Sequence, residues 1–508
     1  MAEWSAATTF AQVWADAVDA RPDAPFLTFE APDGEVTDWT YSEFDSVVAR
    51  LASQLAGHDV GPGTSVHIAL TNCPTFVATW IATARLGAWI VPGDPMGRGP
   101  EFADQIERTA PSIGFCATTR RDEYLGAVAP GLVVVEVDES DSTFHWLPDD
   151  EFTHWPTPAA LDTAAVMFTS GTTGRPKGVV ITQANYAFAG KTMAEAADLR
   201  ADDRHLVVLP LFHANAQYYS FASAIWAGAS VALMHTFSAS GFLAQAARHD
   251  ATCASLFAAP LLMILARGGP VDGLKLRHCW FAQNLADDQY ETISDWFGFR
   301  PRQLYGMTET IPAVLTDRAA DPRADSMGFV TTGCEVEIHD PDGARMAAGE
   351  VGEIVVRGTP GITLFADYLA DPDTTAASFR DTWFLTGDRG SCDATGRFFF
   401  DGRRSDVLKV AGENVSTVEV EAVLTAHPDV FEASVVGAPD PVRDEVPVAF
   451  VVPSDAAAPP SVDDLLAWCG SRLGKAKQPR DITLLDELPR TSVGKIRKFM
   501  LKDEVLRS

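Results

Sequence analysis

The stretch Phe168 to Gly178, with the sequence FTSGTTGRPKG, decides how the rest of the chain is interpreted. The apolar run that leads into it, Ala164 to Phe168, is typical of a buried parallel strand. Its glycines, Gly171 and Gly174, let the backbone turn tightly and approach a ligand. Its possible phosphate donors, besides the loop N–H groups, are Thr169, Ser170, Thr172, Thr173 and Lys177. The pattern therefore predicts a loop that binds a polyphosphate.

This loop is not a Walker A motif, because Pro176 and Gly178 stand where that motif requires Gly and Ser or Thr. The residues that follow, GVVIT, are typical of another strand, so we expect no helix N-terminus directly behind the loop. The alternative, a solvated loop rich in Ser, Thr and Gly, fits a generic cluster of this composition. The full string favours a phosphate site.

The string resembles the phosphate-binding signature of the adenylate-forming superfamily, which comprises acyl-CoA synthetases, luciferases and peptide-synthetase adenylation domains. The resemblance implies an α/β fold with a large N-terminal domain of doubly wound subdomains plus a small β-barrel-like subdomain. It also implies a smaller, mobile α+β C-terminal domain. We expect an adenylation domain over 1–402 with its β-rich part at about 328–402, a hinge at 403–406 and the mobile domain over 407–508.

Composition narrows the class of protein. A length of 508 residues is enough for roughly three units of ~150 residues. A formal charge of −30 argues against a general binder of nucleic acid or anionic membranes. The seven Cys are scattered, and the longest apolar run, Ala251 to Ala266, is shorter than the ~18 residues a membrane span needs. With no signal peptide at the N-terminus, we expect a cytoplasmic enzyme of unknown oligomeric state.

Local patterns agree with this organisation. Between Val66 and Thr310, strand-like and helix-like segments alternate, which is typical of a doubly wound sheet. Thr40 or Ser42 is a candidate cap for the helix that follows, and Ser416 to Glu419 predict a capping box. From Arg472 to Arg507 the chain carries ten Lys or Arg against five Asp or Glu, so a basic tail ends an acidic protein.

A second motif, YGMTE, matches the superfamily's YGxTE and follows the phosphate loop by about 130 residues. The resemblance implies that the Tyr ring stacks on adenine, that the Thr contacts phosphate and that the Glu holds Mg²⁺, together with Thr173. Mg²⁺ is commonly held by one or two carboxylates plus substrate phosphates. The motif residues are Tyr305, Gly306, Met307, Thr308 and Glu309.

Two further motifs complete the nucleotide site. Thr386-Gly387-Asp388 matches the superfamily's TGD, whose Asp accepts hydrogen bonds from both ribose hydroxyls, as suits an acceptor-only carboxylate. Arg403 resembles the Arg that reaches ribose or phosphate. Pro489 to Ile496 matches PRTxxGKI, which makes Lys495 the candidate catalytic lysine. A mobile ammonium that bridges two negatively charged reactants lowers the barrier to their reaction.

The acid and its acceptor are indicated less directly. His213 stands where acyl-CoA synthetases keep a His or aromatic residue beside the acyl pocket, and LFHANAQ lacks the Asp that peptide-synthetase domains pair with an α-amine. An amino-acid substrate is therefore disfavoured. Gly412, within Gly412 to Val415, resembles the Gly that lines the pantetheine tunnel of CoA ligases. ATP/AMP, Mg²⁺ and coenzyme A are the expected cofactors and co-substrates.

Two departures from the superfamily stand out. Ser405 occupies the hinge position that is usually Asp or Lys. Phe281-Ala282-Gln283-Asn284 replaces a Gly-Gly-Ala-Pro-like segment that walls adenine and the acyl pocket, so Gln283 and Asn284 are candidate nucleotide contacts. Phe281 either turns into the core or fills the acid pocket. In the second case the acid is small or flat.

These motifs predict an AMP-forming acid–CoA ligase for a small or flat acid. One alternative keeps the adenylation step but delivers the acid, or even a non-carboxylic acid such as nitrite, to an amine or another acceptor. Another alternative is a non-catalytic nucleotide-binding relative, which the presence of Lys177, Glu309, Asp388 and Lys495 disfavours.

Overall fold

The structure is a computed structural model. It describes residues 5–128, 131–169, 175–403, 407–410, 413–440, 443–490 and 496–507. The chain forms two compact units. Unit 1 comprises Met1–Val336 and Val356–Phe384, and unit 2 comprises Glu337–Val355 and Leu385–Ser508. The expected division at 403–406 stays a prediction, since residues 404–406 lie outside the described residues.

One sheet of unit 1 has the strand order β6-β5-β3-β4-β7-β8. Its strands are β3 Ser65–Ala69, β4 Trp89–Pro92, β5 Ile113–Ala117, β6 Val133–Val137, β7 Thr163–Thr169 and β8 Lys177–Thr182. The strands pair in parallel except for β7 and β8, which form an antiparallel hairpin around the phosphate loop. The prediction that a strand, not a helix, follows this loop is therefore confirmed. The connecting helices include α3 Pro74–Arg85, α4 Gly99–Thr109 and α5 Arg121–Ala127, preceded by the 3-10 turn η1 Thr118–Arg120.

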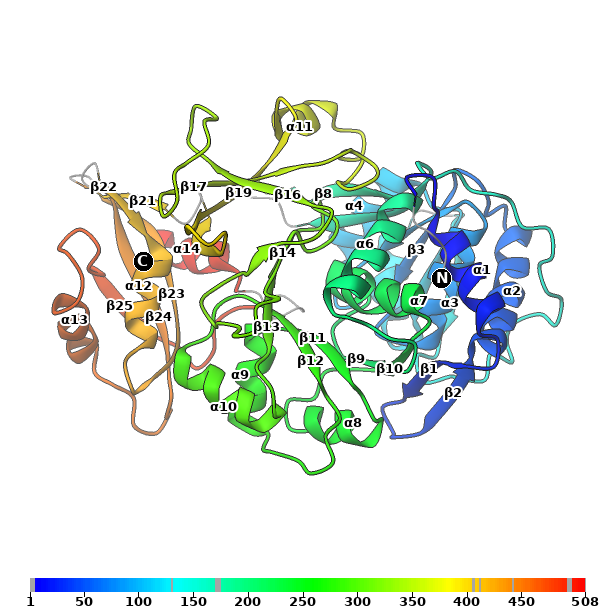
Figure 1. Cartoon of the computed structure of the whole chain (residues 1–508), viewed down its shortest axis with the longest axis horizontal. Coiled ribbons are helices and arrows are strands. Elements are labelled where there is room, and N and C mark those ends of the chain that lie inside the picture. Colours follow the sequence, from blue (N-terminus) through cyan, green and yellow to red (C-terminus); the bar gives the residue numbers. More distant parts are fainter. Residues whose placement is uncertain are drawn as a thin grey trace. The chain divides into compact units, whose positions relative to one another are not determined.

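The other sheet of unit 1 has the order β15-β14-β13-β12-β11-β9-β10-β1-β2. Its strands are β1 Pro25–Glu30, β2 Val36–Thr40, β9 Arg204–Val207, β10 Ser230–Met234, β11 Cys253–Phe257, β12 His278–Ala282, β13 Arg302–Tyr305, β14 Leu315–Thr316 and β15 Phe329–Val330. Other helices of unit 1 are α1 Phe10–Ala20, α2 Tyr41–Gly57, α6 Gln183–Ala196, the π-helix η2 Asn215–Ala222, α7 Ser223–Ala227, α8 Phe242–Arg248, α9 Ala258–Arg267 and α10 Asp287–Phe297 (Figure 1). Thr40 caps α2 in a capping box with Glu43, which selects one of the two predicted caps.

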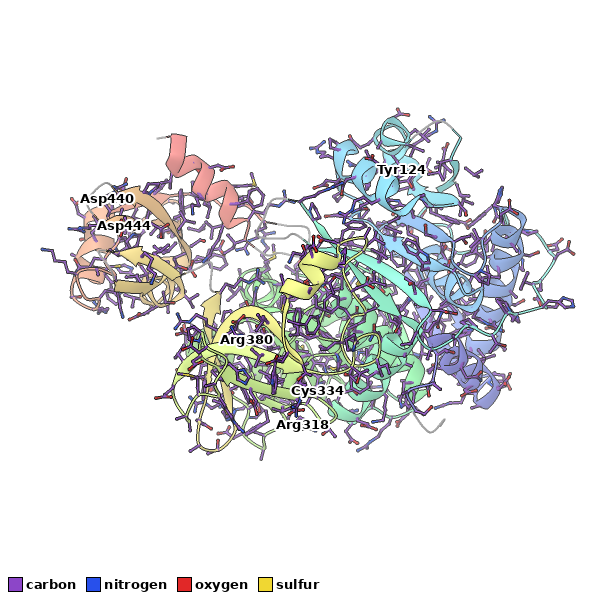
Figure 2. All side chains as sticks on the ribbon, turned by 90° about the horizontal axis from the view of Figure 1, so that it is seen from above. Tyr124, Arg318, Cys334, Arg380, Asp440 and Asp444 are labelled. Atoms are coloured by element: carbon purple, nitrogen blue, oxygen red, sulfur yellow. The ribbon has the colours of Figure 1, made fainter. Side chains whose placement is uncertain are left out.

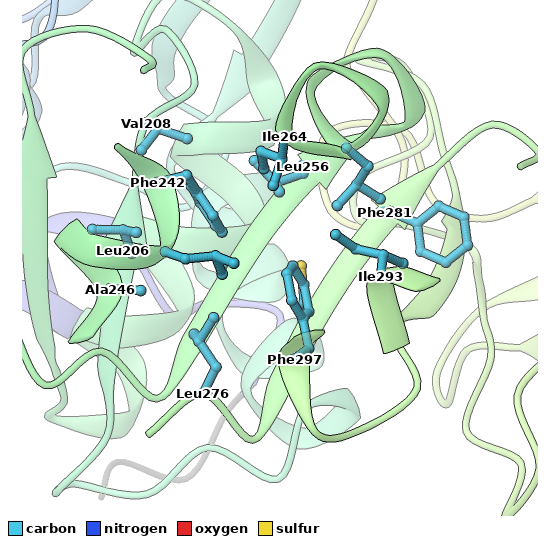
Figure 3. Close-up of a cluster of buried hydrophobic side chains, with 14 of the residues drawn as sticks. Leu206, Val208, Phe242, Ala246, Leu256, Ile264, Leu276, Phe281, Ile293 and Phe297 are labelled. Carbon is cyan, nitrogen blue, oxygen red and sulfur yellow. The ribbon is translucent and has the colours of Figure 1, made fainter. Parts of the chain in front are cut away.

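The apolar core of this sheet lies where α8, α9 and α10 pack on one face of the central strands. Figure 3 shows Phe281 of β12 within this cluster. The side chain is 0% exposed, and its ring centroid lies 6.0 Å from that of Tyr290 on α10. The hypothesis that Phe281 narrows the acid pocket is therefore wrong. Phe281 lies on the helix-covered face, where its bulk fills the core.

The β-rich part predicted from Gly328 onward contains a sheet with the order β16-β17-β19-β18, and β20 pairs with β19. These strands are β16 Glu335–His339, β17 Val351–Arg357, β18 Phe379–Arg380, β19 Trp383–Cys392 and β20 Phe398–Arg403, with helix α11 at Pro372–Ala377. The period-two pattern of the sequence correctly indicated strands here.

The C-terminal part of unit 2 has a sheet ordered β22-β21-β24-β23, with β25 pairing β24 in parallel. Its elements are β21 Val407–Val410, β22 Glu413–Ser416, α12 Thr417–Thr425, β23 Val430–Asp440, β24 Asp444–Pro453, α13 Val462–Gly470, β25 Asp481–Leu484 and α14 Lys498–Arg507. Ser416 precedes α12, but its side chain makes no capping bond, so the predicted capping box is wrong. Its hydroxyl instead donates to the Asp401 carbonyl over 3.5 Å.

Four of the ten Lys and Arg of the basic tail form ion pairs within unit 2 among the described residues. Figure 2 labels Asp440, which accepts from Arg480 at 3.4 Å. The other pairs are Lys477 with Glu419 at 2.7 Å, Lys498 with Glu421 at 2.8 Å, and Arg490 with Glu432. These four positive charges thus link the tail to the rest of this unit.

Within the described ranges, no helix is both long enough and apolar enough to span a bilayer. The seven cysteines all lie in these ranges, and none is joined to another by a disulfide.

Truncation of Phe281 should now destabilise the protein. We expect Phe281→Ala to lower the free energy of unfolding of unit 1 by about 3–5 kcal/mol, because it opens a cavity in the core. Denaturant unfolding followed by tryptophan fluorescence measures this. The control Phe499→Ala removes a ring that is 62% exposed and should change stability by less than about 0.5 kcal/mol. Equal effects of the two variants would contradict the core assignment.

Candidate active site

The base of the phosphate loop is well defined. Thr169, at the end of β7, pairs with Lys177, at the start of β8. Between them, the predicted phosphate-binding residues Ser170, Gly171, Thr172, Thr173 and Gly174 lie outside the described residues. A side chain at Gly178 would come within 3.1 Å of Val166 and 3.2 Å of Leu369, so the hairpin is closely packed here.

Helix α4 anchors the flank of the loop. Arg108 donates to the Pro176 carbonyl over 2.7 Å, and its guanidinium lies 4.8 Å from the Phe168 ring centroid. Asp104 accepts from Arg175 at 2.6 Å and from Arg108 at 3.3 Å. One carboxylate therefore organises the two arginines beside the loop.

The segment 366–369 runs alongside β8 and brings Tyr368 to the loop. The Leu369 N–H donates to the Gly178 carbonyl over 2.8 Å, and Tyr368 bridges Val179. The Lys177 ammonium lies 4.6 Å from the centroid of the Tyr368 ring, within the range of a cation–π contact. Tyr368 is thus a neighbour of the phosphate-loop lysine.

The same tyrosine contacts the glutamate of the YGMTE motif. Its hydroxyl donates to Glu309 Oε1 over 3.0 Å, while the Phe365 N–H donates to the Glu309 carbonyl over 2.9 Å. Glu309 is only 5% exposed. Burial, followed by the charge of Glu309, raises the pKa of Tyr368 above its ordinary value, so the phenol keeps its proton and remains a donor. Tyr368 therefore joins two motifs that the sequence keeps about 130 residues apart.

Sequence reasoning missed Tyr368. A buried carboxylate needs hydrogen-bond donors, but the sequence does not say which residue supplies them. The Tyr lies outside every motif that pointed to the nucleotide, and its role depends on a pairing between distant segments.

The YGMTE segment forms a tight turn after β13. A Cβ on Gly306 would lie 2.8 Å from the Tyr219 hydroxyl, 2.9 Å from Ala313 Cα and 3.1 Å from the Pro312 carbonyl oxygen, so only glycine fits. The turn is closed by Thr310, whose hydroxyl accepts from the Met307 N–H over 2.9 Å. Tyr305 is buried, whereas Met307 and Thr308 are half-buried on the turn.

Gln283 and Asn284 follow β12 and are exposed at its carboxyl end. Gln283 has a φ of 77°, a left-handed conformation that costs free energy in a residue other than glycine. Gln303 stabilises the turn, because its amide donates to the Gln283 carbonyl over 3.2 Å and to Asn284 Oδ1 over 2.9 Å. Gln303 is a second residue that sequence reasoning missed.

His213 lies just before η2 and is half-buried. Its Nδ1 accepts from the Asn215 N–H over 3.2 Å. Its ring meets the ring of Phe257, at the end of β11, edge-on with centroids 5.5 Å apart. The structure thus places His213 at the carboxyl end of a central strand, which is where ligands of α/β sheets bind.

In unit 2, Asp388 of β19 and Arg403 of β20 are direct partners across an antiparallel pair. The Arg403 Nε lies 3.3 Å from Asp388 Oδ1. Asp388 is 4% exposed, and its N–H donates to the Thr386 hydroxyl over 3.1 Å. The preceding Gly387 N–H donates to Glu353 over 3.1 Å. The TGD turn is therefore fixed by hydrogen bonds on both sides.

The remaining predicted residues, Lys495 and Gly412, lie outside the described residues, as does Ser405. Those beside Lys495 are described. Arg490 and Ile496 form a bridge, and the Arg497 N–H donates to the Pro489 carbonyl over 2.7 Å. The structure thus brings together Lys177 and Glu309 in unit 1, and Asp388 and Arg403 in unit 2.

Known families match both parts of the chain. A model of the AMP-binding enzymes matches residues 14–369, and a model of their C-terminal domain matches residues 419–495. The crotonobetaine/carnitine–CoA ligase of Salmonella choleraesuis (strain SC-B67) is 33% identical over 508 residues, which cover 97% of this chain and 98% of the relative. The corresponding ligase of Escherichia coli O139:H28 (strain E24377A / ETEC) is equally similar.

Solved structures of CoA ligases and related enzymes have the same fold. ATP-bound MatB from Rhodopseudomonas palustris is 25% identical with a TM-score of 0.87, covering 97% of this chain and 98% of that one. The o-succinylbenzoate–CoA synthetase of Bacillus subtilis, in complex with ATP and magnesium ion, is 29% identical with a TM-score of 0.82, covering 97% and 99%. The fold and the site therefore define an adenylate-forming enzyme.

This chain belongs to the AMP-binding enzyme family. It is an AMP-forming ligase of the acid–CoA type, which confirms the resemblance inferred from the motifs.

Loss of the Tyr368 hydroxyl should weaken the Mg²⁺ binding that we propose for Glu309. In Tyr368→Phe we expect the Mg²⁺ concentration for half-maximal pyrophosphate release to rise about tenfold, because a hydrogen bond to a charged group is worth ~1.5–3 kcal/mol. The control Tyr124→Phe (Tyr124 is labelled in Figure 2) removes another buried hydroxyl, which contacts His67 at 2.8 Å. It should lower stability without changing the Mg²⁺ requirement. A Mg²⁺ profile of Tyr368→Phe identical to that of the wild type would rule out this role.

Proposed function

We propose that this ligase activates a small or flat carboxylic acid, and that Lys177, Glu309, Asp388 and Lys495 carry out the first half-reaction. A carboxylate oxygen of the acid attacks the α-phosphorus of ATP, and the bond to the β-phosphate oxygen breaks to release pyrophosphate. The coenzyme A thiol then loses its proton and attacks the acyl carbon, and AMP leaves. The observation that supports this proposal most strongly is the Lys177–Tyr368–Glu309 arrangement in unit 1.

The residues of unit 1 are assigned to the phosphates and the metal. Thr169 and Lys177 close the base of the loop and would donate to phosphate oxygens together with Ser170 to Gly174. Glu309 would hold Mg²⁺ with Thr173. The donor set fits, because a single buried carboxylate beside a phosphate loop suits an ion that takes most of its ligands from phosphates and water.

Further residues are assigned to the adenine, the ribose and the phosphates of the nucleotide. Tyr305, Gly306 and Met307 would line the adenine with Gln283 and Asn284, and Thr308 would contact phosphate. Asp388 would accept from the ribose hydroxyls, since a carboxylate that is an acceptor only suits a vicinal diol. The Arg403 guanidinium, 51% exposed beside it, would reach ribose or phosphate.

The acid is assigned to the face of the sheet near His213. Phe281 lies in the core and does not narrow the acid-binding site, but other bulky residues lie on the face near His213. Phe257 contacts the His213 ring, and Trp280 is buried on the same side of the strands. Large rings near His213 leave little room for a long aliphatic chain, which supports a small or flat acid.

Transfer to coenzyme A is assigned to residues of the C-terminal part. We propose that residues 403–406 form a hinge between an adenylation domain, 1–402, and a mobile domain, 407–508. Rotation about this hinge would move Lys495 out of the active site and bring Gly412 into it. Gly412 would then line the route by which pantetheine enters. The crotonobetaine/carnitine–CoA and o-succinylbenzoate–CoA ligases named above are relatives that use CoA.

Pyrophosphate release tests this proposal directly. A panel of acids of increasing length is measured with ATP and Mg²⁺, with and without coenzyme A, and thioester formation is followed separately. We expect short or aromatic acids to turn over and a thioester to form. Adenylation without any thioester, or a preference for long-chain acids, would contradict the proposal.

Removal of the Lys495 ammonium should separate the two half-reactions. We expect Lys495→Ala to slow adenylation by about 10²–10³-fold or more, because a preorganised charge at the transition state is lost. Thioester formation from pre-made acyl-adenylate should suffer much less. The control Lys475→Ala removes an exposed charge of the same basic tail. If Lys495→Ala slows both half-reactions equally, the two-conformation mechanism is rejected.

Removal of the Glu309 charge should weaken the binding of Mg²⁺. We expect Glu309→Gln to turn over poorly at limiting Mg²⁺ and to recover partly at high Mg²⁺, because a neutral amide is a weaker ligand for this cation. Thermal unfolding should show that the variant stays folded. Normal turnover of Glu309→Gln at limiting Mg²⁺ would show that Glu309 does not hold the ion.

A further inference from the structure

A set of buried polar side chains in the second sheet of unit 1 has no hydrogen-bond partner among the described residues. The unpaired atoms include Ser255 Oγ on β11, Trp280 Nε1 and His278 Nε2 on β12, and both amide atoms of Asn215 on η2. Ser255 is 3% exposed, Trp280 0% and Asn215 1%. Buried polar groups in folded proteins are normally paired, so each exception needs an explanation.

Strand register places these groups on one face of the sheet. Ser255 pairs with Trp280, and paired residues on neighbouring strands share a face. The next pair along, Leu256 and Phe281, belongs to the apolar core under α8, α9 and α10. Because successive side chains alternate between faces, Ser255 and Trp280 point away from that core.

Helix η2 covers this second face. It packs against β9 and β11. His213, which precedes it, contacts Phe257, and alternation places the Phe257 side chain on the same face as Ser255. Asn215 begins η2 two residues after His213, and π-helical turns are frequent at functional sites. The unpaired groups therefore come both from the strands and from the helix that covers them.

The unpaired groups also lie at a suitable distance from the carboxyl ends of the strands to contact the far end of a bound acid. Ligands of such sheets bind at the carboxyl ends of the strands, here beside Phe257 and His213. Ser255 and Trp280 lie two residues further in, which corresponds to about 7 Å along a strand. An acid whose carboxylate lies near His213 would extend its other end toward these two side chains.

The chemistry of the set defines what it can accept. The indole N–H of Trp280 is only a donor, whereas the Ser255 hydroxyl and the Asn215 amide can donate and accept. His278 is uncharged at neutral pH, because burial lowers its pKa to about 3. Arg302, the strand partner of Trp280, already donates to the carbonyls of Asp317 and Ala319. A neutral oxygen matches these uncharged groups, whereas a second carboxylate would have to lose its hydration on burial.

We propose that Ser255, Trp280 and Asn215 determine specificity by hydrogen-bonding a neutral oxygen, a hydroxyl or a carbonyl, at the end of the acid distant from its carboxylate. This inference rests on the proposed function and names its substrate class: short or flat acids that carry an oxygen on the tail. Hydrocarbon acids of the same size would leave the buried donors unpaired and are discriminated against.

Matched acids test this proposal. The kcat/KM for pyrophosphate release is measured with phenylacetic, 4-hydroxyphenylacetic and 4-carboxyphenylacetic acids, and with hexanoic and 6-hydroxyhexanoic acids. We expect at least a tenfold preference for the hydroxylated member of a pair. Ser255→Ala and Trp280→Phe should each reduce that preference at least threefold, with a smaller effect on the hydrocarbon acid.

The control is Ser434→Ala, which removes another buried hydroxyl without a partner, on β23 of unit 2. It should leave the preference unchanged, and its thermal midpoint shows how much stability such a change costs. Equal kcat/KM values within both pairs, a preference for the dicarboxylic acid, or an unchanged preference in both site variants would overturn the proposal. In each of those cases the proposed ligase activity stands. The absence of pyrophosphate release with every acid would instead reject the proposed function itself.

Discussion

The hydrogen bond from the Tyr368 hydroxyl to Glu309 is the contact on which the candidate site of unit 1 depends. It fixes a carboxylate that is almost fully buried, and the same ring lies beneath the Lys177 ammonium. A negative and a positive group are thereby held around one aromatic ring. Both groups belong to the set that we propose to act on a polyphosphate and its metal.

The second sheet of unit 1 divides its two faces between stability and chemistry. Leu256 and Phe281 face the apolar core with α8, α9 and α10. Ser255 and Trp280, one residue away on the same strands, face η2, and their side-chain polar atoms have no partner in the part of the chain that the structure describes. Since side chains alternate along a strand, a shift of one residue in register would exchange the two faces. The tight apolar packing on one face therefore fixes the positions of the polar groups on the other.

The sequence was most informative where chemistry is concentrated in a short string. The phosphate loop, YGMTE and TGD could be identified from adjacent residues alone, and the strand after the loop followed from its composition. The narrow-pocket hypothesis for Phe281 and the capping box predicted at Ser416 were wrong because the environment of each residue depends on a distant segment. Phe281 packs near helix α10, and the Ser416 hydroxyl donates to the Asp401 carbonyl. Tyr368 and Gln303 were missed for the same reason, since each acts on a motif elsewhere in the chain.

The crowding around Gly306 has an evolutionary consequence. Of the atoms that a new side chain would meet, the Tyr219 hydroxyl could be removed by a single substitution, but Ala313 Cα and the Pro312 carbonyl oxygen belong to the backbone. Relief of these two contacts requires the backbone itself to move. A side chain at position 306 is therefore harder to acquire in evolution than one whose neighbours are only side chains.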